Sequence, residues 1–410
     1  MPAYVEAPMS TTKIKLFAFF PLLCACVSLA QVCQAPPGTK DAASRHGIEI
    51  PMLVHGGLVF VPVRMSDGKT YSFLLDSGFE NSVLDPETVR VLHLSSGDKH
   101  VEAAPGGKVE SSTVSGVHRS VGGQTLAEES LTTLDLSGLS PLVGHRIDGV
   151  LGYDFFQQFV VILDYQHQRL TLCDPASFQA GRGQSVALNL DSHQPYMEAQ
   201  IESSSGKLIQ ASIEIDTGKV DPFSLNAAFA RKNGLLDNAP ALLAMKGVSV
   251  RGETQAWVTR AKSLRFAGLV VKNPVMAVAE EDVDRAGGQI GYGLLKRFTI
   301  TLDYGRKKAV FEPNTSLDQP FEFDHAGFVL GTGGADFSSL TVFMVIAGTP
   351  AAAAGAQPGD EILTIQDRPA STFSVGEARE YFEHAVGPQK LSIRRNGSTV
   401  LLTVQCRPIV

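Results

Sequence analysis

The sequence predicts a mainly β protein with two duplicated lobes and a smaller third unit. The 39 Gly and 22 Pro, together with many Val and Thr, are typical of short strands and turns. Two apolar runs, 140 positions apart (216 − 76), each end in an Asp, a hydroxyl residue and a Gly, at Asp76 and Asp216. A different pattern begins after Asn314. The 410 residues suit two to four domains, and 44% hydrophobic residues are enough to fill their cores.

A second pair of motifs repeats with almost the same spacing. Residues 148–156 (DGVLGYDFF) precede an apolar run that ends at Asp164, and residues 288–295 (GQIGYGLL) precede one that ends at Asp303. The offset is 139 positions (303 − 164). A near-constant offset across both motifs indicates duplicated lobes. We place the lobes at residues 50–180 and 181–314.

Two Asp turns of this kind are what a paired-carboxylate hydrolase needs. Two carboxylates within hydrogen-bond reach share a proton, so the pair can activate a water and protonate a substrate. The following Gly allows a tight turn, and the Ser or Thr hydroxyl can hydrogen-bond across the pair. A single Asp-Ser/Thr-Gly is as well explained by a turn after a strand. Two copies inside a longer repeat favour the catalytic interpretation.

The first 30 residues indicate an export signal. Lys13 and Lys15 precede an apolar run over residues 16–30 that is short for a membrane span and ends in a small-residue cleavage pattern. We expect residues 1–30 to be removed, which leaves residues 31–49 as a linker and places the protein in the periplasm or outside the cell. An uncleaved membrane anchor is the alternative.

The first lobe should alternate strands with turns. Its expected elements are a strand at 58–63, a turn at 66–69, a strand that leads into Asp76 and a helix at 83–94, where Pro86 suits a first turn. The pattern of residues 101–121 predicts a mobile hairpin, because Pro105, Gly106 and Gly107 lie between polar and β-branched residues. We take Gly106 and Gly107 as the flap candidate.

The second lobe is less regular, and the third unit differs from both. The sequence predicts a helix at residues 227–236 and strands within residues 245–258. Trp257 lies in the second range, and we expect it to pack in the core. Residues 320–410, here called the C-terminal unit, predict strands and a helix at 374–385. We expect this unit to fold on its own.

Charge and cysteine content exclude several classes of function. A formal charge of −7 without a basic cluster argues against a nucleic-acid partner. Cys33, Cys173 and Cys406, the three cysteines after the signal, are scattered, and no CxxC or HExxH spacing indicates a metal. We therefore expect buried thiols, with one disulfide as an alternative, and neither a metal nor another cofactor.

The two lobes resemble the aspartic peptidases, in particular their bacterial retropepsin-like branch. About 75 residues after each Asp turn comes an apolar pair and a Gly, in Val150-Leu151-Gly152 and in Gln289-Ile290-Gly291, where Gln takes the first apolar place. The resemblance implies acid-protease lobes of the closed β-barrel type, with peptides or proteins as substrates. It implies the following roles: Asp76 and Asp216 as the catalytic dyad, Ser77 and Thr217 as the hydroxyls that link the loops, and Gly78, Gly218, Gly152 and Gly291 as supporting residues.

The C-terminal unit contains the run TPAAAAGAQPGDEIL at residues 349–363. This run matches the SPAxxAGxxxGDxIL signature of bacterial protease-associated PDZ domains, so the unit resembles a PDZ domain. The resemblance implies a peptide-binding loop at Gly327, Phe328 and Val329. It also implies a ligand peptide that adds as a strand to a sheet edge, with its terminal carboxylate held by loop N–H groups.

Two residues depart from the peptidase pattern. Phe79 and Lys219 stand where the family usually has Ala or Ser, so a bulky ring and a cation lie beside the predicted dyad. Two functions follow from these observations: an exported aspartic endopeptidase with a PDZ domain, or an inactive peptide-binding protein that keeps the cleft. A homodimer of the retroviral type is disfavoured because one chain already supplies both Asp turns.

Overall fold

The structure is a computed structural model that describes residues 47–410 apart from 105–106, 128–129, 238, 240–241, 250–251 and 281–286. The predicted signal peptide and most of the predicted linker lie outside these residues. Within the described part of the chain, no helix is long and apolar enough to cross a membrane. The described residues are mainly β, as the sequence predicts, and they form four sheets.

The two lobes have the same strand order. The first-lobe strands are β2 (Leu53–His55), β3 (Leu58–Met65), β4 (Thr70–Leu75), β5 (Val83–Leu84), β6 (Ser96–Ala104), β7 (Gly107–Val114), β8 (Arg119–Val121), β9 (Gln124–Thr125), β10 (Leu131–Thr133) and β11 (Gly149–Leu151). The second-lobe strands are β15 (Tyr196–Glu202), β16 (Leu208–Ile215), β17 (Phe223–Asn226), β18 (Leu243–Ser249), β19 (Gly252–Arg260), β20 (Ser263–Phe266), β21 (Leu269–Lys272), β22 (Val275–Ala279) and β23 (Gly288–Ile290). The first sheet runs β6-β7-β10-β5-β11-β4-β3-β8-β9 and the second runs β18-β19-β22-β17-β23-β16-β15-β20-β21, so each strand in one order has a counterpart in the other. The additional strand β2 of the first lobe pairs with β3 outside this order. Both are open paths, and among the described strands neither closes into the barrel that the resemblance implied.

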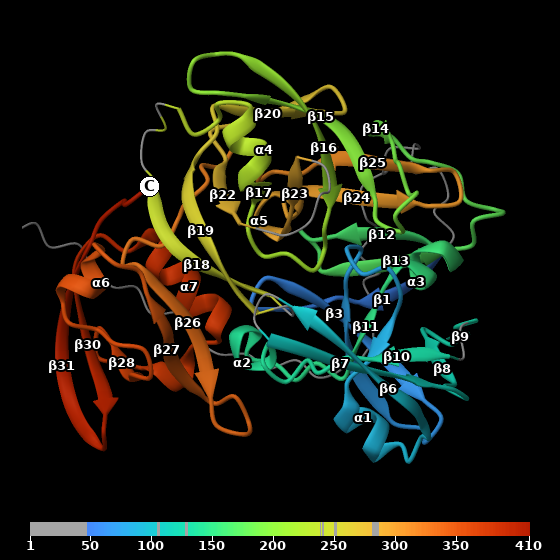
Figure 1. The fold of residues 1–410 in the computed structure, drawn as a ribbon, viewed down its shortest axis with the longest axis horizontal. Helices are drawn as coiled ribbons and strands as arrows, with labels where there is room; N and C mark the ends of the chain where they lie inside the picture. The colour runs from blue at the N-terminus through green and yellow to red at the C-terminus, as the bar shows by residue number, and fades with distance from the viewer. Residues whose placement is uncertain are drawn as a thin grey trace, which may run out of the picture. The chain divides into compact units, whose positions relative to one another are not determined.

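A third sheet joins the lobes. Its strands are β1 (Gly47–Pro51), β12 (Val160–Asp164), β13 (Arg169–Cys173), β14 (Gln184–Ala187), β24 (Phe298–Asp303) and β25 (Lys308–Pro313), in the order β1-β13-β12-β24-β25-β14. The central strands β12 and β24 are antiparallel, with Ile162 opposite Thr301, and they lie side by side in Figure 1. Because each lobe contributes three strands in mirrored order, the sheet relates the two lobes by a pseudo-twofold axis.

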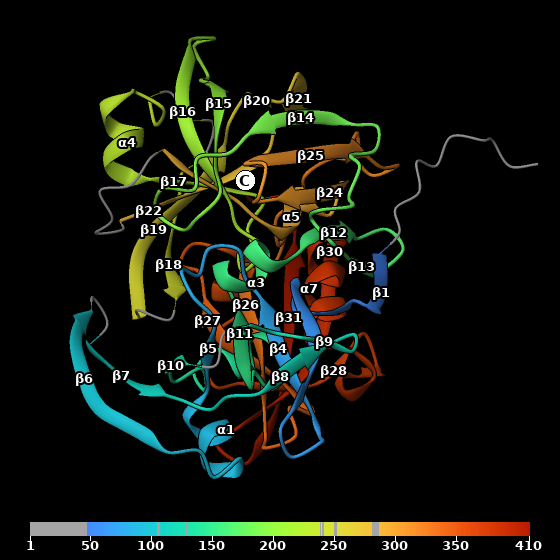
Figure 2. The ribbon, with the colours of Figure 1, turned by 90° about the vertical axis from the view of Figure 1, so that its right-hand side faces the viewer.

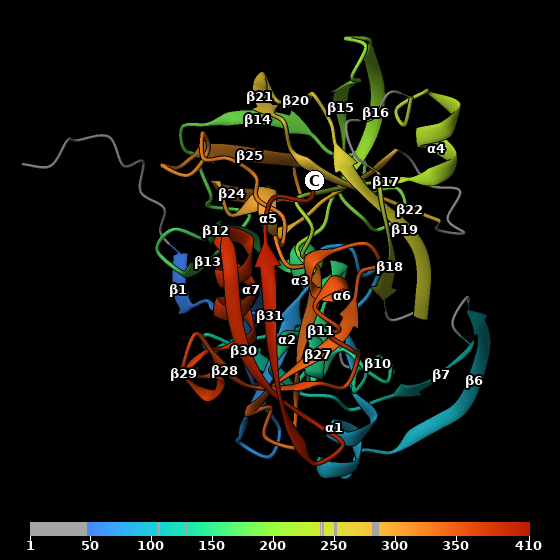
Figure 3. The same cartoon turned by 90° about the vertical axis from the view of Figure 1, so that its left-hand side faces the viewer.

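Long hairpins extend from both lobe sheets. The β6–β7 hairpin of the first lobe and the β18–β19 hairpin of the second extend on the same side of the molecule in Figure 2 and in Figure 3. The partly buried Trp257 on β19 packs against the main core, as expected. That core is one apolar cluster with members from both lobes, such as Leu75 and Ile215.

The helices are short. They are α1 (Pro86–Val91), α2 (Ser140–Val143), α3 (Tyr153–Gln158), α4 (Ala227–Lys232), α5 (Tyr292–Leu295), α6 (Pro350–Ala353) and α7 (Val375–His384), with a 3-10 turn at Ala370–Thr372. The predicted helix at 83–94 begins later than expected because Val83 and Leu84 are buried in strand β5. The side chain of Asp85 then accepts the N–H of Glu87, which caps α1.

The C-terminal unit has its own sheet and its own apolar core. Its strands are β26 (Phe328–Gly333), β27 (Ser339–Val345), β28 (Glu361–Ile365), β29 (Arg368–Pro369), β30 (Gly387–Arg395) and β31 (Ser398–Cys406), with β26 at one edge. Helix α7 begins in a capping box between Ser374 and Glu377, and its Phe382 is fully buried in the core. A separate core is what independent folding requires, and independent folding itself stays a prediction.

Candidate active site

Each Asp turn rests on the strand of the later Gly motif. Asp76 follows β4, which pairs in parallel with β11, and the N–H of Asp76 donates to the carbonyl of Leu151 at 3.0 Å. Asp216 follows β16, which pairs in parallel with β23, and its N–H donates to the carbonyl of Ile290 at 2.9 Å. The repeat in sequence is therefore a repeat in hydrogen bonding.

The hydroxyls of Ser77 and Thr217 connect the two turns. The N–H of Ser77 donates to Thr217 Oγ1 at 2.9 Å, and the N–H of Thr217 donates to Ser77 Oγ at 3.0 Å. In the other direction, Ser77 Oγ donates to the carbonyl of Ile215 and Thr217 Oγ1 donates to that of Leu75, at 2.6 and 2.8 Å. These four buried bonds hold the turns of the two lobes together.

The two carboxyls lie against the opposite turns. The N–H of Gly78 donates to Asp76 Oδ1 at 2.8 Å, and that of Gly218 donates to Asp216 Oδ1 at 2.9 Å. A Cβ built on Gly218 would be 2.0 Å from Asp76 Oδ2, and one built on Gly78 would be 3.1 Å from Asp216 Oδ1. Glycine at each turn therefore leaves room for the carboxyl of the other lobe.

The electrostatics favour a shared proton. Asp76 is 6% exposed and Asp216 is 9% exposed. Burial, followed by the nearby charge of Asp216, raises the pKa of Asp76 well above its usual range, although the N–H of Gly78 opposes the shift. Two buried acids in this arrangement do not both ionise at neutral pH. Below, the two carboxyls are called the dyad.

Gly152 and Gly291 lie beneath the loops that follow the Asp turns. A Cβ on Gly152 would be 2.7 Å from the carbonyl of Asn81, and one on Gly291 would be 2.5 Å from the carbonyl of Lys219. The N–H of Gly152 also donates to Ser82 Oγ at 3.0 Å. The close approach needs glycine at both positions.

A buried third carboxyl, which was not among the residues predicted from the sequence, lies beside the dyad. Glu214 is 2% exposed, and its Oε2 accepts hydrogen bonds from Gln289 Nε2 at 3.1 Å and from Tyr196 Oη at 3.2 Å. Burial and the charge of Asp216 raise the pKa of Glu214 to about 8. Strand periodicity places Glu214 on the same side as Asp216, two positions later, but does not predict its burial.

A cavity of about 1470 Å³ contains both aspartates in its lining, together with Phe79 and Lys219. Phe79 packs against an apolar cluster that includes Leu74, so the ring forms part of the wall. Lys219 Nζ is 3.5 Å from Asp221 Oδ2. The charge of Lys219 also lowers the pKa of Glu214, which opposes the effect of burial there.

The flap candidate is described only in part. Gly106 lies outside the described residues, and Gly107 begins β7, whose Ser111 lines the cavity. In the second lobe, Met245 and Lys246 of the β18–β19 hairpin also line the cavity. That hairpin was not among the site residues predicted from the sequence.

The predicted PDZ loop already binds a carboxylate of this chain. Oδ1 of Asp324 accepts the N–H groups of Ala326, at 2.8 Å, of Gly327, and of Phe328, at 3.2 Å. Burial raises the pKa of Asp324 to about 6. Val329 follows in strand β26. A ligand carboxylate at this loop would therefore have to displace Asp324 from two of the three predicted residues, Gly327 and Phe328.

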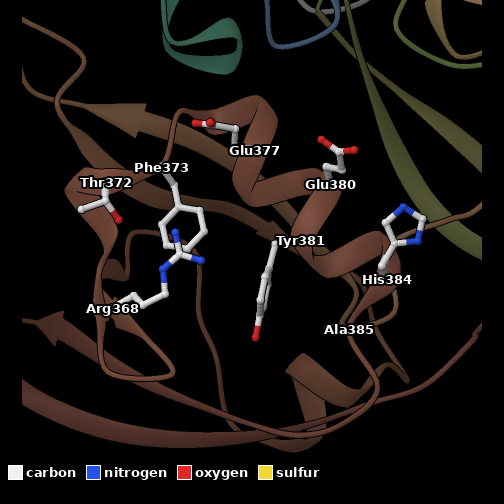
Figure 4. A pocket seen from close by; sticks show the side chains of 8 residues that line it. All are labelled: Arg368, Thr372, Phe373, Glu377, Glu380, Tyr381, His384 and Ala385. Atoms are coloured by element: carbon white, nitrogen blue, oxygen red, sulfur yellow. The ribbon is translucent and has the colours of Figure 1, made fainter. Parts of the chain in front are cut away.

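A hollow of about 430 Å³ lies elsewhere on the C-terminal unit (Figure 4). Its lining consists of Arg368, Thr372, Phe373, Glu377, Glu380, Tyr381, His384 and Ala385. Arg368 lies over the ring of Phe373, with its guanidinium carbon 4.3 Å from the ring centroid. Neither dyad residue belongs to this lining, although Phe373, Glu377, Glu380 and His384 also line the larger cavity that contains the dyad.

Arg379 on α7 connects the C-terminal unit to the first lobe. Its guanidinium donates to the carbonyls of Gly56, Leu142 and Leu330 at 3.1, 2.6 and 2.6 Å. We expect Arg379→Ala to lower the free energy of unfolding by about 3 kcal/mol, because buried carbonyls lose a charged donor. Urea unfolding would measure the change. The control Arg394→Ala removes a half-exposed ion pair with Glu361 and should cost at most about 1 kcal/mol; equal losses would contradict the prediction.

Comparison with known proteins supports a protease. Residues 61–155 match the family model of aspartyl proteases, a range that includes Asp76 and Gly152 and ends before Asp216. The match supports a hydrolase that acts on peptides or proteins.

A curated relative is also named as a protease. The chain is 41% identical over 80 residues to the protein named metalloprotease MmpA of Caulobacter vibrioides, which is 19% of this chain and 20% of that protein. The chain thus covers a fifth of that relative's length. Among the residues that the structure describes, no group of three or more His, Cys, Asp or Glu side chains is placed to hold a metal ion.

Proposed function

We propose that this protein is an exported aspartic endopeptidase, periplasmic or secreted, in which Asp76 and Asp216 activate a water molecule. The observation that carries the proposal is the set of four hydrogen bonds through Ser77 and Thr217, which holds two buried carboxyls together at one cavity. Such fixed geometry is what a shared-proton mechanism requires.

Hydrolysis proceeds in two balanced steps. The ionised aspartate removes a proton from water as the water oxygen bonds to the peptide carbonyl carbon, and the protonated aspartate gives its proton to the carbonyl oxygen. The resulting tetrahedral diol then collapses. Its C–N bond breaks while a carboxyl protonates the leaving nitrogen, and a diol hydroxyl returns a proton to the dyad. The products are a carboxylic acid and an amine, and the dyad again holds one proton.

We further propose that the C-terminal unit binds a peptide or the terminus of a partner protein along β26. The position of β26 at a sheet edge supports strand addition there. Part of that edge already has a neighbour, because Thr332 Oγ1 donates to the carbonyl of Pro141 at 2.9 Å. The carbonyl of Leu330 also accepts a hydrogen bond from Arg379. Peptide binding is therefore expected at Phe328 and Val329.

The test of the peptidase is incubation of the chain from Gln31 onward with a mixed peptide library from pH 3 to 8, with products identified by mass spectrometry. Internal cleavage that survives a metal chelator supports the proposal. Cleavage that the chelator abolishes would contradict the aspartic type. Peptide binding without cleavage at any pH would favour the alternative function, an inactive peptide-binding protein, which Phe79 and Lys219 suggest.

A further inference from the structure

The two lobes differ at a pair of facing strand positions beside the dyad. In the first lobe, Leu74 of β4 lies opposite Val150 of β11. In the second lobe, the corresponding residues are Glu214 of β16 and Gln289 of β23. The pseudo-twofold axis relates an apolar pair to a polar pair, so the surroundings of the two aspartates are unequal.

Gln289 acts on only one aspartate. Its Nε2 is 3.0 Å from Asp216 Oδ2 and 3.1 Å from Glu214 Oε2, and an amide nitrogen has two hydrogens, so both bonds can form at once. A donor favours the ionised form of the carboxylate that accepts from it. Val150, the corresponding residue beside Asp76, has no side-chain donor. Each Asp also accepts the N–H of the Gly of its own turn, so these two donors do not distinguish the aspartates.

Glu214 is placed to stay protonated near neutral pH. Its Oε1 is buried and has no hydrogen-bond partner among the described residues. It lies 3.0 Å from where a Cβ on Gly78 would be, so it faces the turn of the other lobe. The titratable groups that face Glu214 are Asp76, Asp216, Tyr196, Lys219 and Tyr304. An ionised carboxylate with one oxygen lacking a donor in a buried site is costly, in keeping with its pKa of about 8.

We propose that Glu214 and Gln289 are positioning residues that assign unequal roles to the dyad: Gln289 holds Asp216 ionised as the base, Asp76 carries the proton, and Glu214 extends activity toward higher pH. This inference rests on the proposed peptidase function.

The sign of the pH effect follows from the order of ionisation. Above about pH 8, Glu214 carries a negative charge beside Asp76. A negative neighbour disfavours the ionised form of Asp76, so Asp76 keeps its proton to a higher pH than it would beside an uncharged side chain. Activity needs that proton, and the alkaline limb of the rate profile should therefore depend on Glu214.

The test measures kcat/KM of the full chain from pH 3 to 10 with a cleaved peptide. Glu214→Gln is expected to move the alkaline limb down by on the order of one pH unit. Gln289→Met is expected to move the acidic limb up by on the order of one pH unit, because ionised Asp216 loses a donor. The control is Glu202→Gln on β15, which removes a carboxylate paired with Lys262 and Arg265 in the same lobe and should move neither limb.

The outcomes separate this inference from the proposed function. Wild-type cleavage with a Glu214→Gln profile that superimposes on the wild type would overturn the role of Glu214. An unchanged acidic limb in Gln289→Met would overturn the assignment of Asp216 as the base. Absence of cleavage by the wild type would instead refute the peptidase itself. If Glu214→Gln does not fold, Glu214→Leu, which introduces the first-lobe residue, removes the same charge and should show the same shift.

Discussion

Replacement of either dyad carboxyl should abolish turnover. Asp76→Asn and Asp216→Asn are each expected to lower kcat/KM by on the order of 10³-fold or more, because one acid must accept a proton from water while the other donates one. Asn has nearly the shape of Asp and can still accept the N–H of the following Gly. The loss should therefore be chemical and should leave the melting temperature near or above that of the wild type, since a buried acid has been neutralised.

The control is Asp67→Asn, which removes an exposed carboxylate from the β3–β4 turn, and its kcat/KM should equal that of the wild type. The wild-type rate should also fall as pH rises through the upper apparent pKa of the dyad. Burial and the charge of Asp216 raise the pKa of Asp76, but Asp76 still loses its proton at high enough pH, and the mechanism needs that proton. Equal cleavage by the wild type and both dyad variants would refute the assignment.

The duplicated architecture could be predicted because it depends on local sequence and on spacing. The apolar runs before Asp76 and Asp216 and the two later Gly motifs keep a near-constant offset, and the structure gives both lobes one strand order. Strand β5 was harder to identify. Val83 and Leu84 precede a good helix start, and only their pairing with strands distant in sequence, β10 and β11, makes them a strand.

Glu214 and Asp324 could not be assigned from sequence because their surroundings come from distant segments. Alternation along a strand places Glu214 on the same side as Asp216, but its burial depends on Tyr196, Gln289 and the turn of the other lobe. Asp324 precedes the predicted peptide-binding loop by a few residues, and only the folded loop shows that its N–H groups donate to this side chain. In both cases a carboxylate that is usually exposed is buried by tertiary contacts.

A second large effect is expected from one methyl group at the dyad. Gly218→Ala would place a Cβ 2.0 Å from Asp76 Oδ2, far inside contact distance, so the carboxyl or the turn must move. A displacement of about 1 Å in a catalytic group costs on the order of 10²-fold in rate, and we expect a loss of kcat/KM of that order. Gly78→Ala should lose less, because its nearest neighbours, in Glu214 and Asp216, would be 3.0 and 3.1 Å away.

Gly138→Ala is the matched control, since a Cβ there would meet no atom within 4 Å. It should leave both kcat/KM and the melting temperature unchanged. The three variants differ only in where one methyl group is added, so their rates should fall in the order of the contact distances, with Gly218→Ala the slowest and Gly138→Ala equal to the wild type. Wild-type cleavage by a folded Gly218→Ala variant would contradict this prediction. It would mean that Asp76 does not act from its position against Gly218, so the observed dyad geometry would not be the catalytic one.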